Sequence, residues 1–443
     1  EALAAALEAS GDDGRGLAER FCSLVAEHGR EDAEQSLDSL AFATALHTLG
    51  SVLALMAQRR PDWAASWCRL VRACSGPLVR SWLNARGLTR SRGVFERWPG
   101  KLRDEAFAQV RRTIVFSVPR PATCPLNCLP PGMRVWARAP ARLDLAGGWS
   151  DTPPYSLEHG GCVLNAAVNL DGQPPIQAYG RVLEEPVIRL ISIDQDKRAE
   201  IRTVPELLDC RTPSSEFALP KAALVLAGLA PDRAPWPSGT CLEDILKRFG
   251  GGIELTTEAK VPAGSGLGAS SIMGAVLLAV LYRIMGRQIQ LRELFRDVLR
   301  LEQSLTTGGG WQDQIGGLTP GVKMIVTVPG LQPQPQWHAV PGALLNPAAN
   351  GGATMLYYTG ITRLAKDILD KVVARCLDRD RTTRAVLERI KALPPTIADT
   401  MKSGDYAGFG KGITAAWALK KELDPGAATA EIEALFERVS PYV

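Results

Sequence analysis

The chain has 443 residues, which is enough for two or three domains with a sizeable core. Charged residues make up 22% of it and the formal net charge is +4, a balance too mild to indicate a nucleic-acid or membrane partner. The most apolar run, Ala41 to Ala57, is interrupted by His47 and Ser51 and is interpreted as a buried helix. We therefore expect neither a nucleic acid nor a membrane as partner.

Nine cysteines are dispersed along the chain, an odd set that suits a reducing cytoplasm better than a disulfide framework. The tightest pair, Cys124 and Cys128, has no second Cys or His pair nearby, which disfavours a zinc site. The first residues do not resemble a signal peptide. We expect a cytoplasmic protein and, because the chain begins at Glu1 rather than at a methionine, a portion of something longer.

Residues 1–118 are predicted to be helical. Ala, Leu, Arg and Glu dominate, and apolar residues such as Leu17, Phe21 and Leu24 recur at helical spacing. No chemistry stands out, so a helical interaction or linker region is the expected role. Residues 119–131 hold five prolines, which stiffen a chain and end secondary structure, so we expect a linker and a domain boundary there.

Strands and helices are mixed after the linker. We predict strands at 134–138, 141–146, 162–170, 176–182, 187–193, 201–204, 323–328 and 355–358. Helices are predicted at 220–229, 270–285, 291–306 and over most of 365–436, with a Pro-rich loop at 329–352. Because this order is not a regular alternation of strand and helix, the predicted fold class is α+β with mixed sheets.

A glycine-rich loop between a strand-like run and an apolar helix-forming run is the most informative motif. Its candidate ATP-binding residues are Pro262, Gly264, Ser265, Gly266, Leu267, Gly268, Ala269, Ser270 and Ser271. Glycines let the backbone approach an anion, and the free N–H groups at a helix N-terminus point at it. The two serines at the helix start can cap the helix or bind a metal on the phosphates. The loop predicts a nucleoside triphosphate site.

Other interpretations of this loop were weighed. A glycine-rich turn with a serine cap and no ligand stays open when the loop is taken alone. A dinucleotide loop also needs an acid about 20 residues on, at the end of a second strand, whereas Arg287 to Gln303 is predicted to be a helix. A P-loop is excluded because no Gly-Lys-Ser/Thr occurs. A kinase loop outside the P-loop class remains.

A second segment runs from the strand that carries Arg142 into the turn Gly147-Gly148-Trp149 and ends at Asp151. A carboxylate at a strand end can accept hydrogen bonds from sugar hydroxyls, and a nearby arginine can balance phosphate charge. The alternative is a β-turn with an Asx cap and a surface arginine.

A third segment places Glu302 near a helix end, before a triple glycine that includes Gly309 and Gly310, and Asp313 in a tight glycine-flanked turn. Buried acids must be paired or coordinated. Phosphoryl transfer needs a metal ligand and often an acid that receives or orients the acceptor hydroxyl, and Glu302 and Asp313 can supply these roles. The alternative is a helix-end Glu and a turn Asp, both solvated.

Together the three segments resemble the GHMP kinase superfamily, whose glycine loop has the form P-x-x-x-G-L-x-S-S. Ala269 stands here for the first serine. The resemblance implies ATP and Mg²⁺ as cofactors, with Ser270 and Glu302 as metal ligands. It also implies that Asp313 is the catalytic acid or base.

The same resemblance places Arg142 near the reacting hydroxyl and Asp151 on the sugar. Residues 142–154, 308–314 and 358–363 are similar to L-fucokinases in particular, and the likeness covers roughly 134–443. It implies phosphorylation of L-fucose to L-fucose 1-phosphate for GDP-fucose salvage. The substrate-binding residues it implies, besides Asp151, are Gly147, Gly148, Trp149, Gly309, Gly310, Thr359 and Gly360.

The resemblance also implies a domain order. Residues 1–118 resemble the region that precedes the kinase in fucokinases, 132–330 the N-terminal lobe with the ATP loop, and 331–443 the C-terminal lobe. The family's third glycine-rich motif is not found, so we expect an incomplete C-terminal lobe. A nucleotidyltransferase domain, if the protein has one, is expected upstream of Glu1.

Two other functions stay open. One is another GHMP sugar kinase, such as a heptose-phosphate kinase, which would need a basic cluster near Asp151. The other is a non-catalytic sugar or nucleotide sensor with the kinase fold, against which the intact Ser270, Glu302 and Asp313 argue.

Overall fold

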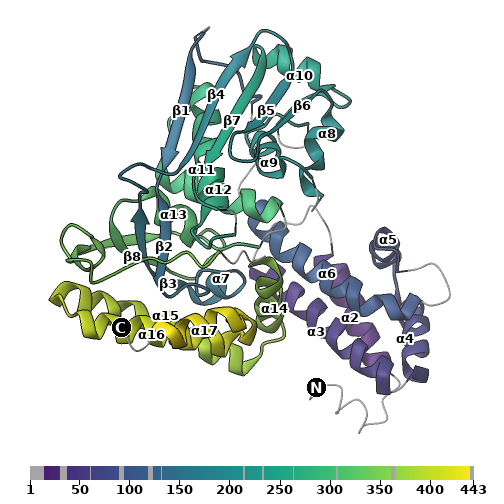
Figure 1. Cartoon of the computed structure of the whole chain (residues 1–443). Helices are drawn as coiled ribbons and strands as arrows, with labels where there is room; N and C mark the ends of the chain where they lie inside the picture. The colour runs from purple at the N-terminus through teal and green to yellow at the C-terminus, as the bar shows by residue number, and fades with distance from the viewer. Residues whose placement is uncertain are drawn as a thin grey trace. The chain divides into compact units, whose positions relative to one another are not determined.

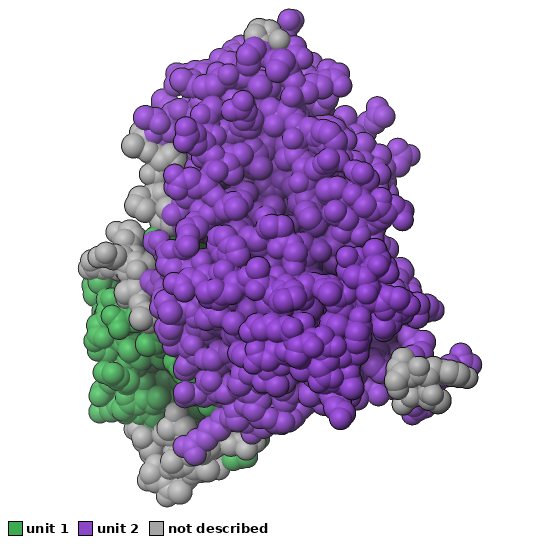
Figure 2. Space-filling model, turned by 90° about the vertical axis from the view of Figure 1, so that its left-hand side faces the viewer, with its two compact units in different colours: residues 1–117, 374–380 green, residues 118–373, 381–443 purple. Residues whose placement is uncertain are grey.

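The structure is a computed structural model of the chain. It describes residues 14–29, 37–59, 61–88, 94–117, 123–130, 132–212, 215–231, 234–262, 264–305, 308–360 and 365–439. The chain divides into two compact units, residues 1–117 with 374–380 and residues 118–373 with 381–443 (Figure 2). Of the Pro-rich segment 119–131, only 123–130 belongs to the described residues.

The first unit is helical, as its apolar spacing predicts (Figure 1). Its helices are α2 (Arg15–His28), α3 (Leu37–Arg59), α4 (Pro61–Cys74), α5 (Pro77–Ala85) and α6 (Val94–Val115). Their core is aromatic: the ring of Trp67 lies 6.1 Å from that of Phe21 and meets the ring of Trp98 edge to face. By length and composition α3 could cross a membrane, but 56% of its apolar window is buried within the protein.

A segment distant in sequence completes this unit. Helix α14 (Ala365–Leu377) ends in it, and the next residue, Asp378, accepts hydrogen bonds from α3. The buried Nδ1 of His47 lies 2.8 Å from the Asp378 carboxylate, and the Ser51 hydroxyl donates to it at 3.3 Å. The pair anchors residues 374–380 to the helical unit.

The second unit contains two sheets. The first has the order β1-β4-β7-β5-β6, with β5 and β7 parallel and the other neighbours antiparallel. Its strands are β1 (Arg134–Ala139), β4 (Ile176–Leu183), β5 (Ile188–Ser192), β6 (Lys197–Ile201) and β7 (Gly252–Ala259). The apolar helix α11 (Ala269–Ile284) packs on β1, β4 and β7 and supplies much of the core.

The second sheet is antiparallel in the order β2-β3-β8-β9. Its strands are β2 (Ala141–Ala146), β3 (Gly161–Val168), β8 (Val322–Thr327) and β9 (Gln336–Val340). Successive side chains of β3 lie on opposite faces of the sheet. Val163 therefore packs toward the short helix α13 (Gln312–Leu318), and Leu164 packs toward α15 (Arg381–Ser403). Because α13 also contacts α11, it joins the two halves of this unit (Figure 1).

The remaining described helices cover these sheets and connect their strands. They are α7 (Tyr155–His159), α8 (Val204–Leu208), α9 (Ala218–Leu226), α10 (Leu242–Phe249), α12 (Leu291–Ser304), α16 (Tyr406–Leu423), α17 (Ala430–Val439) and the 3₁₀ turns Asp209–Arg211, Ala343–Leu345 and Pro425–Ala427. Mixed helices and strands confirm the predicted α+β class.

Some predicted elements are wrong. The strand predicted at 201–204 ends at Ile201, because Thr203 and Glu206 form a capping box that starts α8. Residues 355–358 are not a strand but an exposed segment without regular structure. The Pro-rich loop 329–352 contains β9, and Asp313 lies in the first turn of α13 rather than in an isolated turn.

The close approach of α11 to β4 generates the first prediction. A Cβ added to Gly180 would lie 2.3 Å from Cγ1 of the buried Val280, so Gly180→Ala should lower the free energy of unfolding by about 1–3 kcal/mol. Gly410→Ala is the control, because this exposed α16 position has open space and should gain about 0.5–1 kcal/mol. Urea unfolding followed by circular dichroism measures both changes. Equal stability of wild type and Gly180→Ala would contradict the packing.

Candidate active site

An ion pair between Arg142 and Asp313 lies at the centre of the site. Arg142 is buried on β2, and its Nε donates to Oδ1 of Asp313 at 2.8 Å, with Nη2 donating to the same oxygen. Its Nη1 donates to the carbonyl oxygen of Gly266, and its backbone N–H to that of Leu267 at 3.1 Å. Burial alone would lower the pKa of Arg142, but Asp313 and neighbouring carboxylates raise it. Arg142 thus joins the glycine loop to α13.

Glu302 lies beside this pair in the last turn of α12 and is only 7% exposed. The hydroxyl of Ser271, in the first turn of α11, donates a short hydrogen bond to Glu302 and lies 3.4 Å from Oδ2 of Asp313. Burial, with a smaller contribution from the charge of Asp313, raises the pKa of Glu302 to about 8. At neutral pH the Glu302 carboxyl therefore keeps its proton unless a positive charge approaches.

Asp151 is 1% exposed and bridges two segments through backbone N–H groups. Its Oδ1 accepts from Trp149 and its Oδ2 from Gln312, both at 3.1 Å. Burial and the nearby Asp313 raise its pKa to about 7. Asp151 therefore connects the Gly147–Trp149 turn to the start of α13, a structural function that the sequence does not reveal.

More acidic than basic side chains surround the Arg142–Asp313 pair. Asp144 pairs separately with Lys420 at 2.8 Å, which leaves Arg142 among Asp151, Glu302 and Asp313. Within the described part of the chain, no three His, Cys, Asp or Glu side chains gather so that they could hold a metal by themselves. Mg²⁺ in kinases typically takes one or two carboxylates and completes its ligands with phosphate oxygens. The oxygen donors of Glu302, Asp313 and Ser271 fit that pattern.

A buried lysine that sequence reasoning missed fixes the far end of α13. Lys323 on β8 is 1% exposed, and its Nζ donates to the carbonyl oxygens of Gly316, Thr319 at 2.7 Å and Gly321 at 3.0 Å. Burial lowers its pKa to about 7. The sequence gives little sign that this lysine is buried, because a single lysine in an apolar strand is equally typical of an exposed position at a sheet edge.

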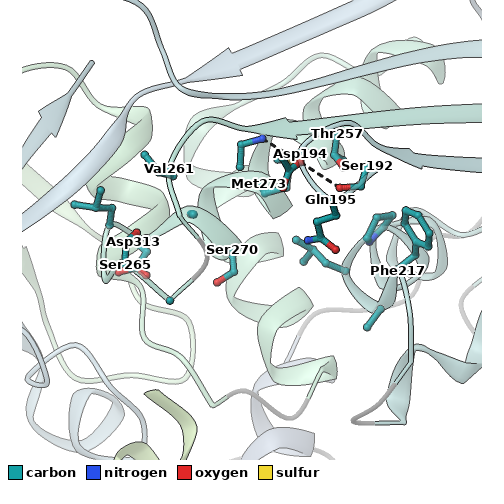
Figure 3. Close-up of a pocket in the computed structure, with 18 of the residues that line it drawn as sticks. Ser192, Asp194, Gln195, Phe217, Thr257, Val261, Ser265, Ser270, Met273 and Asp313 are labelled. Atoms are coloured by element: carbon teal, nitrogen blue, oxygen red, sulfur yellow. Dashed lines mark hydrogen bonds between the residues drawn. The ribbon is translucent and has the colours of Figure 1, made fainter. Parts of the chain in front are cut away.

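A cavity of about 770 Å³ opens beside the ion pair (Figure 3). Asp313 and Ser265 lie toward one side in this view, and Phe217 and Gln195 toward the other. Between them, Asp194 accepts hydrogen bonds from the Ser192 hydroxyl at 3.1 Å and the Ala259 N–H at 3.3 Å. This volume is in the usual range for small-molecule sites. The β5–β6 turn and the start of α9 were not predicted as site elements, because they share no motif.

Most of the predicted ATP-binding residues of the glycine loop line the cavity, but two of them do not. Those that line the cavity are Gly264, Ser265, Gly266, Leu267, Gly268, Ala269 and Ser270. Gly264, Gly266 and Gly268 have φ near 74°, which glycine adopts without strain. The Ser265 hydroxyl oxygen is buried and has no hydrogen-bond partner among the described residues, as expected where a ligand supplies one. Pro262 and Ser271 do not line the cavity; Ser271 instead faces Glu302.

Three of the glycines predicted to contact substrate pack closely against carboxylates. A Cβ on Gly309 would lie 2.5 Å from Glu302, and one on Gly310 2.0 Å from Asp151. Gly148 lies in the same way against Asp144, and Gly147 against the carbonyl of Cys162. Trp149 lines the cavity. Thr359 and Gly360 lie in the exposed segment 353–360 and are not among the cavity-lining residues, so the structure does not bring them to the site.

Comparison with known proteins identifies the class. Residues 238–319, which contain the glycine loop, Glu302 and Asp313, match the GHMP kinases N terminal domain. This part of the chain therefore carries the N-terminal domain of the GHMP kinases.

Within that class, the chain is similar to proteins that carry a fucokinase. It is 41% identical over 308 residues to the L-fucokinase/L-fucose-1-P guanylyltransferase of Bacteroides fragilis, a match that covers 70% of this chain and 32% of the relative. It is 36% identical over 315 residues to the bifunctional fucokinase/GDP-fucose pyrophosphorylase of Arabidopsis thaliana, which covers 70% of this chain and 28% of the relative. The chain thus spans about a third of the length of these relatives.

Solved structures with some likeness include two kinases. The mevalonate kinase of Methanococcus jannaschii is 13% identical, with a TM-score of 0.49 over 71% of this chain and 86% of the other. The galactokinase of Lactococcus lactis complexed with galactose is 16% identical, with a TM-score of 0.46 over 76% and 83%.

The raised pKa of Glu302 generates a prediction about pH. The folded protein holds this proton up to about pH 8, whereas an ordinary glutamate releases it near pH 4.5. Stability from the protonated carboxyl is therefore fully present below about pH 4.5 and is lost as pH rises toward 8. Glu302→Gln should remove part of this fall, leaving the part due to Asp151.

Urea unfolding between pH 5 and 8.5 without Mg²⁺ measures the effect. Glu243→Gln, at an exposed α10 position, is the control. Its free energy of unfolding should change with pH at the same slope as that of wild type. A Glu302→Gln slope equal to that of wild type would show that Glu302 is already ionised in the folded protein.

Proposed function

We propose that this chain is an ATP-dependent sugar kinase that phosphorylates the anomeric hydroxyl of L-fucose to give L-fucose 1-phosphate. The observation that carries the proposal is the Arg142–Asp313 pair beside the cavity formed by the glycine loop. The proposed acid-base group, Asp313, would thus lie next to the proposed phosphate cradle. The fucokinase names of the two relatives support L-fucose as the sugar.

The glycine loop and the start of α11 are the proposed triphosphate site. Backbone N–H groups of a loop with successive left-handed glycines can surround an anion, and the N-terminus of α11 adds its dipole. The adenine base would occupy the side of the cavity near Phe217 and Met273, where apolar side chains can cover its faces.

Asp313 would receive or orient the proton of the sugar's anomeric hydroxyl while that oxygen attacks the γ-phosphorus and ADP leaves. Two donors of Arg142 contact one oxygen of Asp313 and hold its carboxylate in place. The other donor of Arg142 holds the glycine loop, so one side chain orients both the acid and the phosphate cradle.

Glu302 and the serines of α11 are the proposed Mg²⁺ ligands. The sequence favours Ser270, but the contacts add Ser271, whose hydroxyl lies between Glu302 and Asp313. When bound, Mg²⁺ neutralises charge on the β- and γ-phosphates. The raised pKa of Glu302 fits this role, because a carboxyl that is costly to ionise alone becomes favourable to ionise beside a cation.

We also infer a cytoplasmic protein and a following nucleotidyl transfer that consumes the sugar 1-phosphate. The dispersed cysteines support the first inference, and all are free in the structure. The names of the relatives, which join a fucokinase to a guanylyltransferase or a pyrophosphorylase, support the second.

Asp313→Asn should lower turnover by ~10² or more, the usual scale for losing a positioned acid-base group, while ATP affinity stays near normal. A coupled ADP-release assay with L-fucose, D-galactose and a heptose phosphate measures turnover, and calorimetry measures ATP binding. Asp399→Asn, an exposed α15 position, is the control. Near-normal turnover of Asp313→Asn contradicts the catalytic assignment. Preference for a heptose phosphate would point to the other sugar kinase, and nucleotide binding without turnover of any sugar to a sensor.

The two serines can be separated by direct metal binding. Ser271→Ala should weaken Mg²⁺ binding to the complex with a non-hydrolysable ATP analogue by about tenfold or more, because it removes an oxygen that contacts Glu302. Ser270→Ala is the matched comparison on the preceding residue. Calorimetric titration with Mg²⁺ measures both, and unchanged affinity in both variants would reject the serines as ligands.

A further inference from the structure

The turn at Gly147–Trp149 has an unusual backbone. Trp149 has φ of 86°, a left-handed conformation that bulky side chains rarely adopt. Such residues persist only where the surroundings over-determine them, and they concentrate at ligand sites. An aromatic residue held in this way beside a cavity therefore needs an explanation.

Several hydrogen bonds hold Trp149 in that conformation. Its N–H donates to Asp151 at 3.1 Å, and its carbonyl oxygen accepts from the Thr152 N–H at 3.1 Å. The buried hydroxyl of Ser150 makes hydrogen bonds with the carbonyls of Gly147 at 2.7 Å and Cys162 at 3.0 Å. The turn is thus fixed on both sides of Trp149, and the direction of its Cα–Cβ bond is fixed with it.

The position of Trp149 is as informative as its backbone. It is half-buried and lines the cavity together with Arg142 and Asp313. Because Asp151 links the N–H of Trp149 to that of Gln312, the residue before Asp313, an acceptor whose hydroxyl reaches Asp313 would lie close to this turn. The polar groups there already bind one another: Asp313 binds Arg142, Glu302 binds Ser271, and Asp151 binds two backbone N–H groups.

We propose that Trp149 determines acceptor specificity, its indole ring packing on the C6 methyl group and the adjoining C–H face of the sugar. This inference rests on the proposed function, because it concerns the acceptor of that reaction. L-fucose is uncharged, and its methyl group distinguishes it from sugars with the same C2–C4 hydroxyls. An aromatic face suits such an apolar patch, and the fixed turn lets the ring meet it without losing conformational freedom.

The test uses a sugar that lacks only the methyl group. D-arabinopyranose has the C2–C4 configuration of L-fucose without C6, so the ratio of kcat/KM for the two sugars reports recognition of that group. Trp149→Gly removes the ring and keeps a backbone that tolerates φ of 86°. Trp149→Phe keeps an aromatic face.

The wild-type ratio should favour L-fucose by about 10-fold or more, the discrimination that an apolar contact of this size supplies. Trp149→Gly should lower this ratio to near 1 by reducing kcat/KM for L-fucose. Its KM for ATP should stay within about twofold and its Tm should equal or exceed that of wild type, since glycine relieves the backbone strain. Trp149→Phe should retain most of the preference.

Two results would overturn the inference while L-fucose remains a substrate. One is an unchanged sugar ratio in Trp149→Gly, which would place methyl recognition elsewhere. The other is an equal loss for both sugars with a lowered Tm, which would make Trp149 a structural residue. If wild type phosphorylates neither sugar, the proposed function fails first and the inference fails with it.

Discussion

The ion pair between Arg142 and Asp313 is the contact on which the rest of the site depends. One guanidinium group binds an acid on α13 and a carbonyl of the glycine loop, while the backbone N–H of the same residue binds the next carbonyl along that loop. Arg142 itself is fixed because β2 is a strand of the second sheet. The three segments that carry chemistry therefore meet at a single side chain, although Arg142 lies 124 residues from Gly266 and 171 residues from Asp313 in the sequence.

The arrangement around that pair keeps α13 in place at both ends. Asp151 binds the N–H of Gln312 at its start, and Lys323 binds carbonyl groups at and beyond its end. Between them, Gly316 and Gly317 let the helix approach Asn165 and Ile272 so closely that a Cβ would overlap with either side chain. Asp313 thus lies on a short helix that is held at both ends and packs closely on its neighbours, which suits an acid that must meet one hydroxyl.

The sequence predicts the fold class and the residues of the ion pair well, because local patterns carry those signals. Strand β2, the glycine loop and the helix after it follow from apolar spacing and glycine placement, and the acids follow from their resemblance to a known order of motifs. What could not be predicted depends on packing between distant segments. Nothing near Asp151 in the sequence shows that it binds the N–H of Gln312, and nothing near Lys323 shows that three carbonyl groups surround it. The exposed residues 355–358 have strand-like composition but no strand partner in the described structure, because composition does not supply a neighbour.

The raised pKa values of Glu302 and Asp151 give the site a further property, that of a proton reservoir. Because of these raised pKa values, Glu302 and Asp151 together carry less than two negative charges near neutral pH. A cation that bound beside them would displace protons, so the heat of its binding would depend on the ionisation enthalpy of the buffer and its affinity would increase with pH. Binding of such a cation would thus be linked to the pH of its surroundings through these two buried carboxyl groups.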